Sequence, residues 1–198
     1  MNKLFNPFEH YSEKVLIVFG LVMLSLGSLA AWYFGGRFDG VIDFHLLDDV
    51  AMWEPFADNA IATFSLVLPL FILAKIINRR TRLVDIVATS LVARMPFIIE
   101  PLFNIGGHLG DSTEKMVARQ ITRDTGVTVV AMPETQGLII IVLFALVSIL
   151  LLVWFATLLY NGFKTATNIR KTAHIIYFII TAIIAEVLSK IIISILFS

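Results

Sequence analysis

Five long runs of apolar residues, separated by polar segments, dominate the pattern of this 198-residue chain. The runs cover residues 15–34, 60–77, 83–105, 137–159 and 173–197. An α-helix needs about 20 consecutive apolar residues to cross the hydrocarbon core of a bilayer, and each run is close to that length. The first run exceeds the roughly 7–15 apolar residues of a signal-peptide core, so we interpret it as an anchor. The pattern predicts an all-α membrane protein, with residues 1–198 forming one domain and a bundle of five transmembrane helices.

Charged residues inside the third and fifth runs set these two apart from the others. The third run contains Arg94 and Glu100, and the fifth contains Glu186 and Lys190. A charge at the centre of a membrane helix costs ~2.5–3.5 kcal/mol on insertion scales, so we expect each to have a partner or a function. Counted from the basic starts of the two runs, Arg94 lies at the depth of Glu186, and Glu100 lies at the depth of Lys190. This predicts that the third and fifth helices are neighbours, joined by the pairs Arg94–Glu186 and Glu100–Lys190. Structural pairing is favoured over a transport path, because the chain has no inverted repeat.

Two prolines interrupt the third run. Pro96 and Pro101 each remove a backbone donor and crowd the carbonyl four residues earlier, which predicts kinks in this helix. Lipid cannot satisfy the freed carbonyls, so the kinked face is expected to lie against the bundle or a cavity.

The polar segment between the first two runs, residues 35–59, is acidic. It has six carboxylates and one basic residue, Arg37. Its apolar residues recur at helical spacing, at Ile42, Leu46, Val50 and Trp53. Anionic lipid does not attract an acidic helix, so the spacing predicts a helix that packs on the protein.

Residues 106–136 form the longest polar segment. The acidic and hydroxyl residues at 111–114 are typical of a helix start, which predicts a short helix from there to about Arg123. The triplet Asp124-Thr125-Gly126 also occurs in aspartic proteases. That chemistry needs two carboxylates sharing a proton, and no second triplet is present, so we interpret the triplet as a helix end turned by Gly126.

Composition narrows the class of protein further. Hydrophobic residues make up 58% of the chain and charged residues 15%, which leaves no length for a separate soluble catalytic domain. Lysine and arginine balance aspartate and glutamate at 15 each, so no global charge attracts nucleic acid. The chain has no cysteine, which excludes disulfides and thiol chemistry. Its four histidines are scattered without the spacing of a zinc site, so we expect no catalytic, metal or cofactor site.

The distribution of basic residues predicts an orientation. Lysine and arginine gather in the segment before the first run and in the short segments after the second and fourth runs. Because cytoplasmic loops carry an excess of these residues, we expect the N-terminus to be cytoplasmic and the C-terminus to be outside.

The order of spans and motifs resembles the Yip (Ypt-interacting protein) domain family of five-span membrane proteins, especially its short bacterial members. The resemblance rests on Asn6-Pro7-Phe8, Ala74–Asn78 with Thr81-Arg82, Ala93–Phe97, and Trp154-Phe155 with Leu159–Lys164. It implies a polytopic helical membrane protein with no known catalytic chemistry. Eukaryotic members of the family are linked to small GTPases and vesicle traffic, and no GTPase-binding residue can be transferred to this chain.

These observations give two hypotheses for function. The first is a non-enzymatic integral membrane protein of Yip type, in the bacterial inner (plasma) membrane. It would act on membrane organisation or trafficking through the lipid bilayer and a protein partner or second copy. The alternative is a small transporter, channel or transporter subunit that uses the charges of the third and fifth spans.

Overall fold

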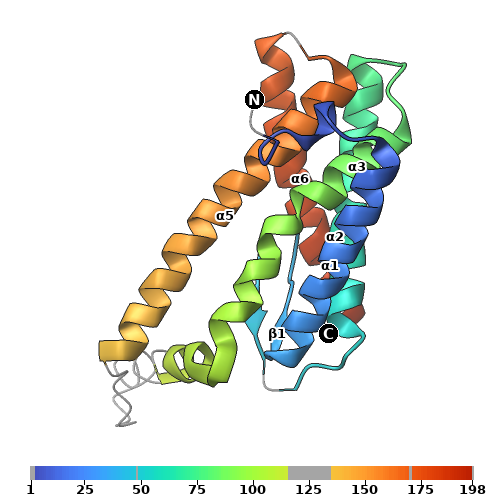
Figure 1. Ribbon diagram of the computed structural model, residues 1–198. Helices are drawn as coiled ribbons and strands as arrows, with labels where there is room; N and C mark the ends of the chain where they lie inside the picture. Colours follow the sequence, from blue (N-terminus) through green and yellow to red (C-terminus); the bar gives the residue numbers. More distant parts are fainter. Residues whose placement is uncertain (1–2, 48, 116–134, 170, 198) are drawn as a thin grey trace.

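The computed structural model describes residues 3–47, 49–115, 135–169 and 171–197. Within them, five helical segments are long and apolar enough to cross a membrane. This confirms the prediction of an all-α protein with five helices of membrane-spanning length and composition. Figure 1 shows the chain running back and forth along one axis, so that its two ends lie at opposite ends of the bundle.

The helices follow the predicted runs, with shifts at their ends. After a 3₁₀ turn, η1 (Pro7–Glu9), they are α1 (Glu13–Tyr33), α2 (Glu54–Ile77), α3 (Leu83–Ala93), η2 (Met95–Gly107), α5 (Thr135–Thr167) and α6 (Thr172–Phe197). The largest shift is at the end of α5, which continues eight residues beyond the predicted residue 159. The polar residues there remain within the helix, where the hydroxyls of Thr165 and Thr167 donate hydrogen bonds to carbonyls four residues earlier.

The third span is interrupted where its prolines lie. The α-helix of α3 ends at Ala93, before Pro96, and the chain continues as a 3₁₀ helix, η2, in which Pro96 and Pro101 are both buried. A second break with non-helical dihedral angles follows at residues 104–106. The third span therefore bends, as Figure 1 shows, and its prolines lie against the bundle.

Residues 108–115 are helical, so the helix predicted to start near residue 111 begins earlier. The Ser112 hydroxyl does not cap this helix, because it donates to the carbonyl of His108 one turn back, at 2.6 Å. The predicted end of this helix and the triplet Asp124-Thr125-Gly126 lie outside the described residues.

The segment between α1 and α2 is a β-hairpin, and the prediction of a helix there is wrong. Strand β1 (Gly36–Arg37) pairs antiparallel with β2 (His45–Leu46), with Arg37 opposite His45. Residues 36–47, which we call the re-entrant hairpin, run back between the helices instead of lying across their ends (Figure 1). Phe38 and Val41 near its tip are buried in the same apolar cluster as residues of the helices. Neither side chain belongs to the apolar stripe that predicted a helix. Their burial makes the hairpin more stable than a helix for this segment.

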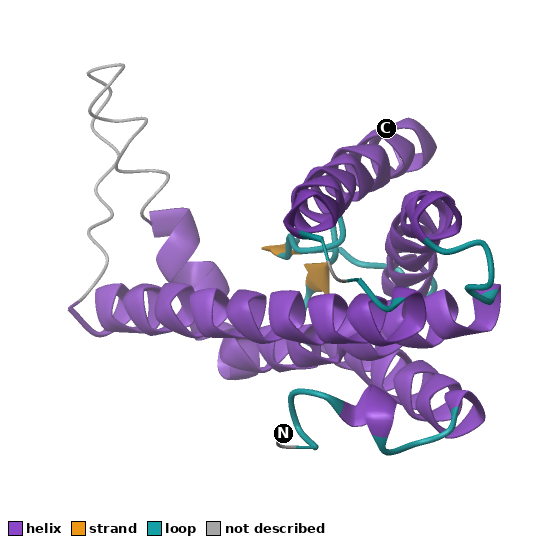
Figure 2. Ribbon diagram, turned by 90° about the horizontal axis from the view of Figure 1, so that it is seen from above, coloured by secondary structure: helices purple, strands orange, loops and turns teal. Residues whose placement is uncertain are grey.

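The third span is the central element of the bundle. In its most apolar stretch, 67% of the residues are buried inside the protein. The corresponding shares are 11% for α5 and 17% for α6. It packs against α1 on one side and α5 on the other, whereas α6 packs on α2. Figure 2 shows α6 and α2 side by side, with α5 crossing at a steep tilt. The apolar faces of α5 and α6 are left exposed, as expected of helices that contact lipid.

A glycine permits the close contact between α3 and α5. A Cβ atom on Gly162 would lie 2.6 Å from both Cγ2 and Oγ1 of Thr89, and 2.9 Å from Cζ of Phe8. Small residues at such crossings let membrane helices approach closely, so this position holds the two helices and the N-terminal segment together.

We expect Gly162→Ala to destabilise the protein by about 1–3 kcal/mol, because the added methyl group overpacks the crossing. Thermal unfolding in detergent measures the change. The double variant Thr89→Ala with Gly162→Ala removes the opposing atoms and should recover most of the loss. A double variant less stable than Gly162→Ala alone would contradict this account.

Candidate functional site

An ion pair fixes the base of the re-entrant hairpin to the start of α2. The Arg37 guanidinium donates to both carboxylate oxygens of Asp58, from Nε at 3.0 Å and from Nη2 at 2.7 Å. It also lies 3.4 Å from the Glu54 carboxylate and 4.1 Å from the centre of the Phe197 ring. The hydrogen bonds to Asp58 raise the pKa of Arg37 above its ordinary value, so the guanidinium stays charged. Two-point contact with a carboxylate fixes orientation as well as distance.

Arg94 holds the tip of the hairpin from the third span. Its side chain is among the most buried in the protein, at 1% exposed. Nη1 donates to the carbonyl of Val41 at 2.7 Å and to that of Gly40 at 3.2 Å, while Nη2 donates to Oδ1 of Asn59 at 2.7 Å. Among the described residues, Arg94 is therefore bound to backbone oxygens and an amide, and not to a carboxylate.

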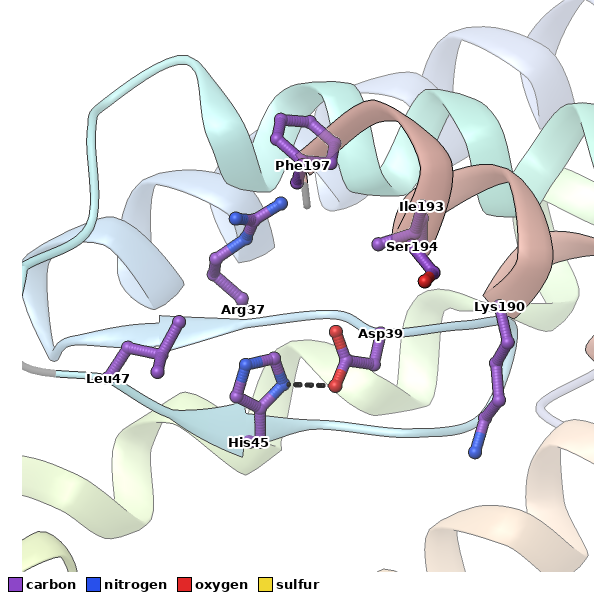
Figure 3. Close-up of a pocket in the computed structure, with 8 residues that line it drawn as sticks. All are labelled: Arg37, Asp39, His45, Leu47, Lys190, Ile193, Ser194 and Phe197. Atoms are coloured by element: carbon purple, nitrogen blue, oxygen red, sulfur yellow. Dashed lines mark ion pairs between the residues drawn. The ribbon is translucent and has the colours of Figure 1, made fainter.

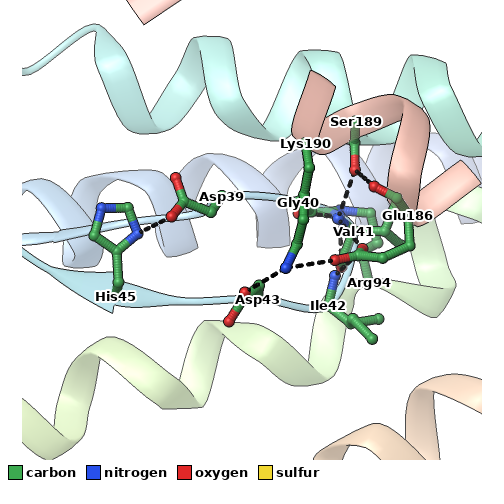
Figure 4. Close-up of polar contacts among 10 residues, drawn as sticks. All are labelled: Asp39, Gly40, Val41, Ile42, Asp43, His45, Arg94, Glu186, Ser189 and Lys190. Carbon is green, nitrogen blue, oxygen red and sulfur yellow. Dashed lines mark hydrogen bonds and ion pairs between the residues drawn. The ribbon is translucent and has the colours of Figure 1, made fainter. Parts of the chain in front are cut away.

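Glu186 holds the same tip from the opposite side. Its Oε2 accepts the backbone N–H of Val41 at 2.8 Å and that of Ile42 at 3.2 Å. Lys190, one turn further along α6, lies 2.7 Å from the Asp43 carboxylate and 3.5 Å from Glu186. Figure 4 shows the hairpin tip lying between Arg94 on one side and the α6 residues on the other.

Gly40 makes the approach of Glu186 possible. A Cβ atom there would lie 2.8 Å from Oε1 and 3.0 Å from Oε2 of Glu186. Any side chain at this position would therefore push the carboxylate away from the N–H groups that it accepts.

The polar contacts continue from Arg94 into α2 and α1. Asn59, whose Oδ1 accepts from Arg94, donates through Nδ2 to the hydroxyl of Ser28 at 2.9 Å. The Ser28 hydroxyl also lies 3.1 Å from the carbonyl of Pro55. A continuous series of hydrogen bonds thus joins α1, α2, the third span, the hairpin and α6.

Both predicted intramembrane pairs are corrected by these contacts. Within the described residues, Arg94 and Glu186 form no ion pair, and the third and fifth spans do not pack directly on one another, because the hairpin tip lies between them. Lys190 pairs with Asp43 and with Glu186, its neighbour four residues earlier, rather than with Glu100. Arg94 and Glu186 do share a partner, but it is the hairpin backbone at Val41 rather than one another.

Several residues that complete the site were not predicted from the sequence. They belong to α1, the hairpin and α2, and are Ser28, Arg37, Gly40, Val41, Asp43, Asp58 and Asn59. The sequence does contain a signal for some of these residues. Arg37 is the only basic residue in an acidic segment, which indicates a pair with one of its carboxylates. No pattern marks the backbone of residues 40–42 as the partner of Arg94.

A cavity of about 460 Å³ lies beside the hairpin, toward the end of α6. Arg37, Asp39, His45, Lys190 and Phe197 line it, as Figure 3 shows. Nδ1 of His45 is 2.8 Å from the Asp39 carboxylate across the two strands. The cations of this cavity all have carboxylate neighbours, so it has no excess of positive charge. Among the described residues, no group of histidine and carboxylate side chains is arranged to hold a metal ion.

At the other end of the bundle, the N-terminal segment docks on α5. Nδ2 of Asn161 donates to the carbonyl of Phe5 at 2.8 Å, and Nε1 of Trp154 donates to that of Leu4 at 3.3 Å. Thr81, from the turn after α2, donates to the carbonyl of Ala166 at 3.2 Å. The N-terminal segment, the turn after α2 and the end of α5 thus meet at this end of the bundle.

A smaller cavity, of about 270 Å³, opens beside this contact and is lined in part by Phe8, Arg82, Asp85 and Gly162. The hydrogen bonds to Asp85 raise the pKa of the exposed Arg82 guanidinium.

Comparison of the chain with family models, curated proteins and solved structures found no match. The function therefore has to be inferred from the geometry of the site.

We expect Arg94→Lys to lower the free energy of unfolding by about 3 kcal/mol or more, because one ammonium group cannot reach all three oxygens that the guanidinium binds. Thermal or denaturant unfolding in detergent provides the measurement. Arg82→Lys is the matched control, since that arginine is exposed, and it should unfold close to wild type. Exchanging the charges of Arg94 and Glu186 should not restore stability, and recovery in that double variant would point to a direct pair.

Proposed function

We propose that this protein is a non-enzymatic integral membrane protein of Yip type, which acts on membrane organisation or trafficking through protein or lipid contacts. The observation that carries the proposal is the position of Arg94. It is buried and bound to the hairpin backbone and Asn59, so the most buried charge of the third span holds the fold together.

Two surfaces support a role through contacts. The exposed apolar faces of α5 and α6 are available to lipid or to another membrane helix. The end of the bundle with the docked N-terminal segment presents exposed basic residues, at Lys3, Lys14, Arg79, Arg80, Lys164 and Lys171. Such a basic surface attracts acidic partners or anionic headgroups.

The proposal includes an orientation, with this basic end in the cytoplasm of a bacterium and the C-terminus outside the inner membrane. The excess of lysine and arginine at that end supports it.

Cysteine labelling tests the orientation cleanly, because the chain has no cysteine of its own. Single variants Arg80→Cys and Glu114→Cys place an exposed thiol in the turn after α2 and in the helix after η2, respectively. In spheroplasts, an impermeant maleimide should label Glu114→Cys directly and Arg80→Cys only after the membrane is permeabilised. The opposite pattern would reverse the orientation.

Cross-linking of native membranes followed by mass spectrometry tests the contact role. We expect lysines of the basic end to cross-link reproducibly to one defined partner protein. Asn161→Ala removes an anchor of the N-terminal segment and should weaken the cross-links from Lys3 and Lys14. Thr157→Ala, one turn earlier on α5, removes only a bond within the helix and should leave them unchanged.

Failure to find a reproducible partner, together with solute flux through the purified protein in liposomes, would favour the alternative. That alternative is a small transporter, channel or transporter subunit, and the cavity of about 460 Å³ beside Lys190 is the observation in its favour. In that case the hairpin would have to leave its place before a solute could pass Arg94.

A further inference from the structure

Glu100 is the one intramembrane charge of the predicted set for which the hairpin provides no partner. It lies in η2 and is 4% exposed, and its Oε2 has no hydrogen-bond partner among the described residues. No cation forms an ion pair with it in the part of the chain that the structure describes. A buried carboxylate left ionised without a partner is among the most costly arrangements in a protein.

The described residues around Glu100 offer no free cation to offset a negative charge. Arg94 belongs to the same span, but its donors are directed to the hairpin carbonyls and Asn59. The hairpin adds a second carboxylate, Asp43, which is paired with Lys190 of α6. The helices packed against η2 are α1, α5 and the preceding α3. α1 and α5 carry no charged residue over residues 15–34 and 135–163, and the charged residue of α3, Asp85, is paired with Arg82 at the far end of that helix.

α5 does offer a hydroxyl. Phe144 and Phe155 of α5 pack on Phe103 and Phe97, which flank Glu100 on η2. Ser148 lies between these two phenylalanines on the same face of α5, and its Oγ also has no hydrogen-bond partner among the described residues. A protonated carboxyl group has one O–H to donate, and a serine hydroxyl can accept it. A metal cation at the same place would need several more oxygen ligands than one carboxyl and one hydroxyl group provide.

We propose that Glu100 is a proton-binding site within the membrane, where its neutral carboxyl group donates a hydrogen bond to Ser148 across the contact between η2 and α5. Aromatic pairs lie near it on the same two elements, Phe97 with Phe155 at 5.3 Å and Phe103 with Phe144 at 5.6 Å between ring centres. Loss of the proton would leave an ion in this apolar contact. Binding of the proton therefore favours the packing of α5 on η2.

Infrared spectroscopy of the purified full-length protein in lipid vesicles tests the proposal. At neutral pH the wild type should show the C=O stretching band of a protonated carboxyl group, and the band should disappear when the pH is raised. Glu100→Gln should remove the band. Ser148→Ala should keep it but shift its frequency, because the hydrogen bond to the hydroxyl is lost.

A stability comparison supplies the second measurement. Glutamine has the shape of a neutral glutamic acid, so Glu100→Gln should unfold at the wild-type temperature. Glu186→Gln is the matched control and should unfold at a lower temperature, because Glu186 accepts two N–H groups as an anion beside Lys190. Absence of the band in the wild type at neutral pH would overturn the proposal. A loss of stability in Glu100→Gln equal to that in Glu186→Gln would also overturn it.

Discussion

Backbone N–H and C=O groups that lie among membrane helices must find partners within the protein, because lipid offers none. The tip of the re-entrant hairpin is the place where this requirement is hardest to meet, since residues 40–42 belong to neither a helix nor a strand. A buried guanidinium donates to its carbonyls and a carboxylate accepts its N–H groups. Each charge is stabilised by peptide dipoles, and each dipole is stabilised by a charge.

The arrangement of the bundle follows from these contacts. The third span lies at the centre because Arg94 must reach the hairpin while α1 and α5 cover its other sides. α6 packs on α2 and contacts α5 through Phe178. It holds the hairpin through Glu186, Ser189 and Lys190. The most apolar surfaces are left facing outward, which is the reverse of a soluble protein and is suited to a bilayer.

Hydropathy predicted the five spans well because membrane thickness sets a length that a run of residues either has or lacks. The charges at Arg94 and Glu186 were also identified, since they stand out against apolar neighbours. Their partners were not, because a backbone carbonyl carries no signature in the sequence. The helical stripe at Ile42 and Leu46 was misleading for a related reason. Burial of Phe38 and Val41 decided the conformation of that segment, and burial depends on helices that lie far away in the chain.

The position of the hairpin along the chain has a consequence for synthesis. Residues 36–47 leave the ribosome after the first span, but Arg94 follows some fifty residues later, and Glu186 follows only in the fifth span. Until then the N–H groups of Val41 and Ile42 have no carboxylate to bind. The hairpin can complete its polar contacts only once the fifth span lies beside it.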